Sequence, residues 1–301
     1  MHRVRLIMDA KANPLRRLIQ IVSAVFLNGY IYGFISGKIY TGEFKNVCVP
    51  VLNCYSCPGA VGSCPVGALQ NTVGMLGKIP FYTLGILALF GVLLGRAVCG
   101  LLCPFGFIQD LLSKIPARSI RVNKRLDYAL KYIKYAVLFG IVIALPVVAY
   151  ATQGYSQPYF CEYVCPAGTL EAGLPLLAAD QMLRGIIGNL FALKLSVLII
   201  IIAVCIFIPR AFCRYVCPLG AFYGLFNKLS LYKMRLNRDK CTNCLKCVRA
   251  CPMQVDVLKD INNIDCIRCS VCADVCPEGA ISSPLDKLKK ELASKQWEKE
   301  S

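Results

Sequence analysis

Histidine is almost absent from this chain of 301 residues, which has only His2. Histidine is a usual ligand of haem iron and of copper and non-haem iron sites, so its scarcity excludes histidine-ligated haem, copper and di-iron centres. The chain has no Cys-x-x-Cys-His motif either, the attachment signal of c-type haem. His2 is badly placed for acid–base chemistry, and no constellation of acid, base and nucleophile is visible. We therefore expect no haem and no catalytic residues of that kind.

Acidic residues are also scarce: there are 17, against 34 lysines and arginines, and the formal net charge is +17. The basic residues flank apolar segments, and no aromatic and basic pattern suited to base stacking is present, so the charge does not indicate nucleic acid. No cleavable signal peptide is evident, because the apolar stretch after residue 17 is long and lacks a small-residue cleavage site. Hydrophobic residues make up 56% of the chain, which exceeds the usual content of soluble domains and predicts a protein embedded in a lipid bilayer.

The apolar residues gather in four stretches that we interpret as transmembrane helices. Their ranges are 18–36, 79–98, 133–151 and 195–208. Residues 1–17, the segment between the second and third stretches, and residues 210–240 are strongly basic, whereas the other two loops are not. The positive-inside rule then predicts a multi-pass protein of the cell membrane with both termini in the cytoplasm.

Eight of the nineteen cysteines form two copies of one motif, Cys-x-x-Cys-x-x-Cys-x-x-x-Cys-Pro. In such a run three thiolates bind one [4Fe–4S] cluster and the fourth binds the cluster of the other run. The first cluster is therefore assigned to Cys241, Cys244, Cys247 and Cys276. The second is assigned to Cys266, Cys269, Cys272 and Cys251. Zinc sites use paired Cys-x-x-Cys units instead, so we expect a small α+β ferredoxin domain of the bacterial type, on the cytoplasmic side, over residues 236–284.

A second pattern, Cys-Pro-x-Gly, occurs four times near the apolar stretches, at Cys64, Cys103, Cys165 and Cys217. Proline favours the first position of a helix, so each cysteine should lie at a helix N-terminus, where the dipole stabilises a thiolate or an anionic cluster. A Cys-x-x-x-Cys pair offers two ligands, and a [4Fe–4S] cube needs four. We therefore assign an inner membrane cluster to Cys99, Cys103, Cys213 and Cys217.

An outer membrane cluster would combine Cys161 and Cys165 with two of Cys54, Cys57 and Cys64. Cys64 fits the Cys-Pro-x-Gly pattern, and Cys57 is favoured as its partner because it too precedes proline, although Cys54 is a close rival. Disulfides among the outer cysteines are the alternative, since the outer compartment can be oxidising. The remaining cysteines, which are Cys48, Cys205 and the outer cysteine left over, are interpreted as structural or weakly bound.

Together, these assignments predict a mainly α membrane protein with a parallel two-fold repeat. Residues 18–112 and 133–235 form the repeat halves, separated by a basic cytoplasmic loop over 113–132. A basic N-terminus over 1–17 precedes them, and a charged tail over 285–301, to which we assign no function, follows the ferredoxin domain.

The repeated Cys-x-x-x-Cys-Pro motifs beside membrane helices, followed by a dicluster domain, resemble the NapH/NosR/CcoG-type membrane polyferredoxins over about residues 45–280. The resemblance implies electron transfer between a quinol or cytoplasmic donor and an outer-face reductase, within a larger membrane complex with redox partners on one or both faces. The sequence lacks the periplasmic flavin-binding domain of NosR-like proteins and the immunoglobulin-like domain of CcoG-like ones. The NapH-like arrangement is therefore nearest.

We expect one-electron transfer through four [4Fe–4S] clusters held by these thiolates. One alternative is a quinol or quinone oxidoreductase that completes proton-coupled chemistry itself, for which Glu162 and Glu171 are candidate proton acceptors. The other is a redox sensor or an assembly scaffold, in which the clusters report rather than conduct. Whether the chain is itself an enzyme stays open at this point.

Overall fold

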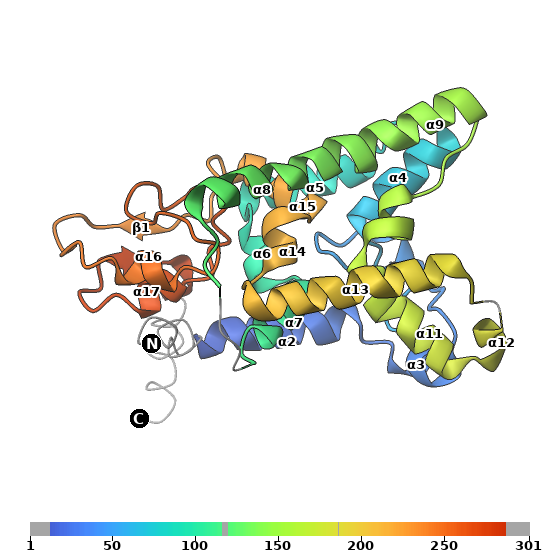
Figure 1. Ribbon diagram of the computed structural model, residues 1–301, viewed down its shortest axis with the longest axis horizontal. Coiled ribbons are helices and arrows are strands. Elements are labelled where there is room, and N and C mark those ends of the chain that lie inside the picture. Colours follow the sequence, from blue (N-terminus) through green and yellow to red (C-terminus); the bar gives the residue numbers. More distant parts are fainter. Residues whose placement is uncertain (1–12, 116–119, 186, 287–301) are drawn as a thin grey trace.

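The computed structural model describes residues 13–115, 120–185 and 187–286, and these residues are mostly helical. The expected basic N-terminus and charged tail therefore lie largely outside the described residues. A small domain with two strands forms one end of the molecule, drawn in orange to red in Figure 1. Its strands β1 (Arg235–Leu236) and β2 (Ile281–Ser282) pair antiparallel and bring the start and the end of the domain together. Two short helices lie between them in the sequence, α16 (Lys246–Ala250) and α17 (Val271–Asp274).

Two helices among the described residues are long and apolar enough to cross a membrane, Lys124–Gln153 and Asn189–Phe207. The first is continuous but contains a π-helical segment, and its parts are α8 (Lys124–Ala136), η2 (Val137–Ala144) and α9 (Leu145–Gln153). Pro146 follows the π-helical segment and cannot donate a backbone hydrogen bond, which explains the irregular turn. The second is α13 (Asn189–Phe207). The two helices contain the predicted span 133–151 and all but the last residue of the predicted span 195–208.

The other two predicted spans are shorter or interrupted. Residues 18–36 do not form one helix, because α2 (Pro14–Leu27) ends before α3 (Ile31–Ser36) begins. Backbone groups of the following cysteine loop replace the helical bonds at this break: Val61 N–H donates to the Leu27 carbonyl at 3.0 Å. The span expected over 79–98 is reduced to α5 (Phe81–Leu93), about 20 Å long at 1.5 Å per residue, against a bilayer core of about 30 Å. The number of spans therefore stays a prediction.

Apolar side chains cover much of the outside of the helical region, and several charged side chains are buried within it. Exposed apolar residues follow one another along α2 and α13: Leu18, Ile21, Val22, Val25, Phe26, Ile199, Ile200, Val204 and Phe207. Meanwhile Arg96, Lys134, Arg210 and Arg214 are fully buried. Exposed apolar faces together with buried charges suit a lipid environment better than water.

The Cys-Pro-x-Gly motifs begin helices, as the sequence predicted. Each cysteine is the N-cap residue in an extended conformation, and the following proline is the first helical residue. The helices are α4 (Pro65–Leu76), α7 (Pro104–Leu112), α10 (Pro166–Gly168) and α15 (Pro218–Phe226). The last three follow short helical turns, α6 (Ala97–Leu101), η3 (Phe160–Val164) and α14 (Ala211–Tyr215). A helix–break–helix unit therefore presents each Cys-x-x-x-Cys pair.

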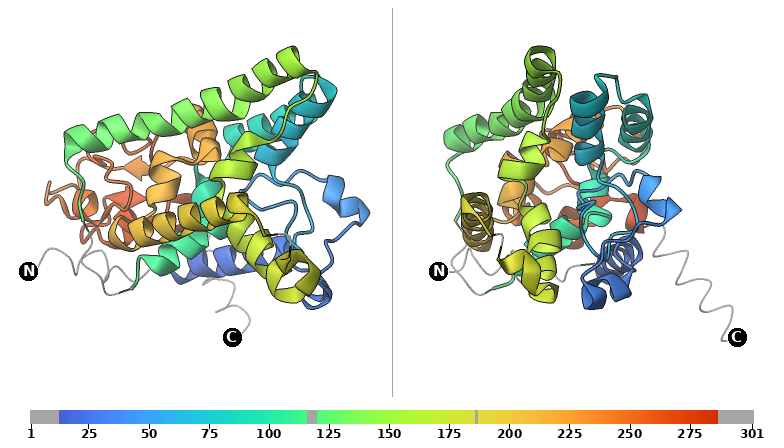
Figure 2. Two further views of the ribbon diagram at one scale, coloured as in Figure 1. Left: turned by 45° about the vertical axis from the view of Figure 1, so that its right-hand side comes forward. Right: turned by 90° about the vertical axis from the view of Figure 1, so that its right-hand side faces the viewer.

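The remaining described elements are η1 (Glu43–Asn46), η4 (Thr169–Gly173), α11 (Leu174–Ala179) and α12 (Gln181–Arg184). In Figures 1 and 2 the ferredoxin domain lies at one end of the long helix α8–α9, and α11 and α12 lie towards the other. One hydrophobic core joins both regions, since Met253, Val255 and Ile267 of the ferredoxin domain belong to the same buried cluster as Phe105 and Phe212. The ferredoxin domain therefore packs directly on the helical region.

Candidate iron–sulfur sites

The eight ferredoxin cysteines line two separate pockets. The first is lined by Cys241, Cys244, Cys247 and Cys276. The second is lined by Cys251, Cys266, Cys269 and Cys272. The fourth cysteine of each run thus lies in the pocket of the other run, which is the arrangement that the spacing predicted for a two-cluster ferredoxin.

Left-handed backbone residues shape both ferredoxin loops. Asn243 and Leu245 have φ of 53° and 60°, and Arg268 and Ser270, at the matching positions of the second run, have φ of 51° and 62°. This region is sparsely populated by residues other than glycine and is retained at functional sites where the surroundings fix it. The repeated turn aims successive sulfurs into the pocket, and only the cysteine spacing indicated such a turn in the sequence.

The thiols suit a cluster rather than a single ion or a disulfide. All nineteen cysteines lie within the described residues, and all are free. Burial, reinforced by Cys251, raises the pKa of Cys266 to about 12, so its thiolate needs a compensating positive charge, such as iron, to form. Among the described residues no three histidine, cysteine or acidic side chains converge on a single-ion site. Thiols around a pocket suit a multi-atom iron–sulfur cluster better than zinc.

The inner set brings the two repeat halves together. Cys99 and Cys213 lie in α6 and α14, while Cys103 and Cys217 cap α7 and α15. All four are buried, and Cys217 interacts electrostatically with the other three. The four residues predicted to share one cluster therefore meet in space, although they come from segments about a hundred residues apart.

A hydrogen-bond donor that the sequence analysis missed also faces the inner set. Gln109, on α7, is buried and donates from Nε2 to the Cys213 sulfur at 3.0 Å. Its Oε1 accepts from the Cys205 thiol at 3.6 Å, so Cys205 supports the site from outside the set of four. A lone glutamine in an apolar helix was the only sequence signal for this role.

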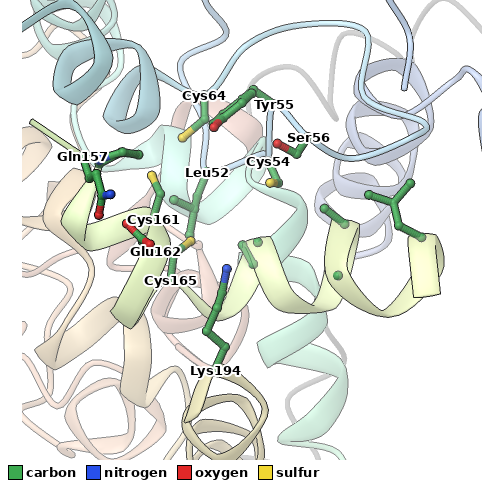
Figure 3. A pocket seen from close by; sticks show the side chains of 16 residues that line it. Leu52, Cys54, Tyr55, Ser56, Cys64, Gln157, Cys161, Glu162, Cys165 and Lys194 are labelled. Atoms are coloured by element: carbon green, nitrogen blue, oxygen red, sulfur yellow. The ribbon is translucent and has the colours of Figure 1, made fainter. Parts of the chain in front are cut away.

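The outer pocket is lined by Cys54, Cys64, Cys161 and Cys165, whose sulfurs face one space in Figure 3. Cys57 is not among its lining residues and instead lies beside the break between α2 and α3, with its thiol 3.6 Å from Asn28 Oδ1. A tight turn, in which Cys57 N–H donates to the Cys54 carbonyl at 3.0 Å, separates the two side chains. The lining of this pocket therefore favours Cys54, the close rival in the sequence, over Cys57.

Charged residues accompany the outer set. Glu162 and Lys194 line the pocket, and the Lys194 side chain reaches towards it from α13. Glu171 accepts a hydrogen bond from Cys54 N–H at 2.9 Å through Oε2, while its buried Oε1 has no partner. Burial raises the pKa of Glu171 to about 7, although the Cys54 N–H acts in the opposite direction. Both carboxyl groups singled out in the sequence thus lie at this site.

Comparisons with known proteins find iron–sulfur domains along most of the chain. The model of a 4Fe-4S binding domain matches residues 63–82, 79–123, 136–175 and 190–238. The model of a 4Fe-4S dicluster domain matches residues 240–281. No solved structure matches the chain.

Three relatives show the extent of the similarity. An uncharacterised protein of Methanocaldococcus jannaschii is 31% identical over 62% of this chain and 64% of its own length. The putative electron transport protein YccM of Escherichia coli is 31% identical over 79% of this chain and 67% of its own length. The ferredoxin-type protein NapH of Haemophilus influenzae is 25% identical over 87% of this chain and 86% of its own length. The chain is an iron–sulfur electron-transfer protein and belongs to the family of NapH/NosR-type polyferredoxins.

Proposed function

We propose that this chain passes single electrons along a row of four [4Fe–4S] clusters, between a cytoplasmic or quinol partner and a redox protein on the outer face of the membrane. The main observation behind this proposal is that the four cysteine sets lie in a row from the ferredoxin domain to the outer pocket. Segments of the chain that contact each other join each set to the next. The thiolates hold and tune the clusters, which supply the one-electron chemistry, and the chain sets their order and burial.

The first link joins the ferredoxin domain to the inner set. Ile267, between two ligands of the second ferredoxin set, packs with its carbonyl against Gly100, which directly follows Cys99. A side chain at Gly100 would collide with that carbonyl, so glycine permits the close approach. Arg210 interacts electrostatically with both Cys213 and Cys269, one residue from each set, which supports their proximity.

The second link joins the inner set to the outer set through the buried segment Val51–Asn53. The backbone N–H of Leu52 approaches the sulfur of Cys103, and the next N–H, that of Asn53, approaches the sulfur of Cys64. Two consecutive peptide groups thus separate one ligand of each set. Tyr223, fully buried, donates to the Pro50 carbonyl at 2.8 Å and fixes this segment from α15.

The membrane arrangement that we propose has four spans and a parallel two-fold repeat, with both termini and the ferredoxin domain in the cytoplasm. The exposed apolar faces of α2 and α13 support it. So do Lys124, Arg125 and Lys131, which place positive charge at the end of the long helix nearest the ferredoxin domain. The break in α2–α3 and the short α5 make these spans irregular, which is tolerated where protein satisfies the backbone.

A reporter fused after Ser301 tests the orientation. An enzyme that is active only in the cytoplasm should be active there, whereas a reporter that is active only on the outer face should be silent. The reverse result would invert the topology and exchange the inner and outer sites.

Quinol oxidation at the outer site is a second candidate function, favoured by the polar groups there. Oxidation of a quinol releases protons as well as electrons, and Glu171 holds a buried carboxyl oxygen without a partner beside Cys54. Glu162 and Lys194 line the same pocket. Reduction of the clusters by a quinol that is lost in Glu171→Gln, with the iron content unchanged, would support this candidate over relay alone.

Metal content and EPR of the anaerobically purified protein test the proposed relay. Four clusters require about sixteen irons per chain and four EPR signals on stepwise reduction. An iron content of about eight, with ferredoxin signals alone, would reduce the chain to a membrane-attached ferredoxin and overturn the proposal.

A further inference from the structure

A buried arginine precedes the cysteine pair in each half of the inner site. Arg96 and Arg210 begin the same pattern, Arg-Ala-x-Cys-x-x-x-Cys-Pro-x-Gly, and both side chains are 0% exposed. Burying a guanidinium is costly unless it is paired and hydrogen-bonded, so a repeated buried arginine beside a cysteine pair needs a reason.

The two arginines cross between the halves. Arg96 Nη2 donates to the carbonyl of Cys213 at 2.9 Å, and Arg210 Nη1 donates to the carbonyl of Cys99 at 2.8 Å. Each arginine of one half therefore holds the backbone of a ligand of the other half. The space beside the two guanidinium groups is kept by glycines: a Cβ at Gly106 would lie 2.8 Å from the Cys99 carbonyl. A Cβ at Gly220 would lie 3.1 Å from Arg96 Nη2.

The remaining contacts of the two arginines differ. Arg210 pairs with Asp110 through two bonds of 2.6 Å and so stays within the membrane region. Arg96 reaches the ferredoxin domain instead, where Nη1 donates to Asp265 Oδ1 at 3.1 Å and to the Ile264 carbonyl at 3.2 Å. Asp265 directly precedes Cys266, a residue of the second ferredoxin set.

We propose that Arg96 is a positioning residue that fixes the ferredoxin domain on the inner site and raises the reduction potential of a cluster held there. Arg210 raises the same potential. One planar guanidinium of Arg96 contacts both the Cys213 carbonyl of the other half and the segment that precedes Cys266. A rigid guanidinium can make both contacts at once, whereas a lysine ammonium cannot. It also interacts with the Cys99 thiol of its own half.

The electrostatic effect follows from the charge of the reduced cluster. Reduction adds one electron, so nearby positive charge stabilises the reduced form and raises the potential. Both guanidinium groups interact with Cys99 and Cys213. Loss of either charge should therefore lower the potential of the inner cluster and leave the outer one nearly unchanged.

The test is an EPR-monitored redox titration of the purified full chain carrying Arg96→Gln, Arg96→Lys or Arg210→Gln, with the magnetic interaction between the inner and second ferredoxin clusters as a second readout. We expect both glutamine variants to lower the inner midpoint potential, and both Arg96 variants to weaken the interaction. Arg96→Lys should restore the potential but not the interaction. Lys134 and Lys131 also form ion pairs with Asp265, so the Asp265 carboxylate keeps a positively charged partner in these variants.

Arg121→Gln is the matched control, because Arg121 also donates to the ferredoxin domain, at the Val248 carbonyl, but has no bond to an inner cysteine among the described residues. It should change neither readout. An unchanged potential and interaction in Arg96→Gln would overturn the inference. If that variant loses its clusters, an unchanged interaction in Arg96→Lys would overturn it instead.

The role of the two arginines rests on the proposed inner cluster, but different results would contradict the cluster and the arginine role. Absence of an inner signal in the unmodified protein contradicts the proposed function. An inner signal of unaltered potential in the arginine variants contradicts only the role of Arg96 and Arg210.

Discussion

The inner and outer cysteine sets of the helical region use the same Cys-Pro-x-Gly element but differ in symmetry and surroundings. The inner set combines two equivalent Cys-x-x-x-Cys pairs, buried among Arg96, Arg210 and Gln109. The outer set combines one such pair with Cys54 and Cys64 from a long loop, beside two carboxyl groups and one lysine. One set is enclosed by positive charge, and the other lines a pocket with acidic groups.

This contrast suggests a division of roles. Buried arginines and a hydrogen bond to sulfur favour the reduced form of a cluster at the inner site. The outer site has less positive charge beside its cysteines and is lined by polar groups, which suits the terminal role that we propose for it. The same ligand motif can therefore serve as an internal relay or as a terminus, depending on what the rest of the chain packs against it.

The largest expected effect separates the inner site from all others. Cys103→Ala or Cys217→Ala should lower the iron content from about sixteen to about twelve and abolish the same EPR signal, because neither pair completes a cube alone. Electrons from the ferredoxin domain should then fail to reach an outer acceptor. Cys48→Ala, buried but outside every set, should keep all four signals. Loss of different signals in the two variants would contradict a shared site.

The outer site gives the second test, through two neighbouring cysteines. Cys54→Ala should remove about four irons and the outer signal, since Cys54 lines the pocket, whereas Cys57→Ala should keep both. Metal analysis and EPR of the two variants decide between them. The opposite outcome would restore Cys57, the residue that the proline pattern favoured, as the ligand.

Disturbing the contact between the inner site and the ferredoxin domain should have a smaller effect, and this effect should be confined to the inner cluster. Gly100→Ala places a Cβ against the Ile267 carbonyl and should destabilise the protein by about 1–3 kcal/mol and slow reduction of the inner cluster. Gly85→Ala is the control, because a Cβ there meets nothing within 4 Å and alanine favours helix α5. Thermal unfolding in detergent and stopped-flow reduction measure the two effects. Equal behaviour of the variants would contradict the close approach.

The smallest effect concerns the hydrogen bond to the inner sulfur. Gln109→Leu removes the donor to Cys213 and should lower the inner midpoint potential by less than either arginine variant, with the iron content unchanged. Redox titration of the inner signal checks this, and the outer signal in the same sample is the reference. A rise in the inner potential would show that the amide does not stabilise the reduced cluster.

The sequence determined the parts of this protein that depend on short spacings. The crossed assignment of the ferredoxin cysteines could be predicted because tight loops of two residues leave few ways for successive sulfurs to point. The helices that begin after Cys64, Cys103, Cys165 and Cys217 could be predicted because proline restricts the backbone on both sides of itself. The inner set followed from counting ligands in two equivalent pairs.

Only the tertiary structure decided what depends on segments far apart in the chain. Cys54 rather than Cys57 faces Cys161, because the turn between them directs one side chain to η3 and the other to Asn28. The helix expected over 18–36 breaks because the loop around Val61 offers alternative hydrogen-bond partners to Leu27. Arg96 and Gln109 face the inner cysteines through packing of distant segments, and local composition cannot reveal such contacts.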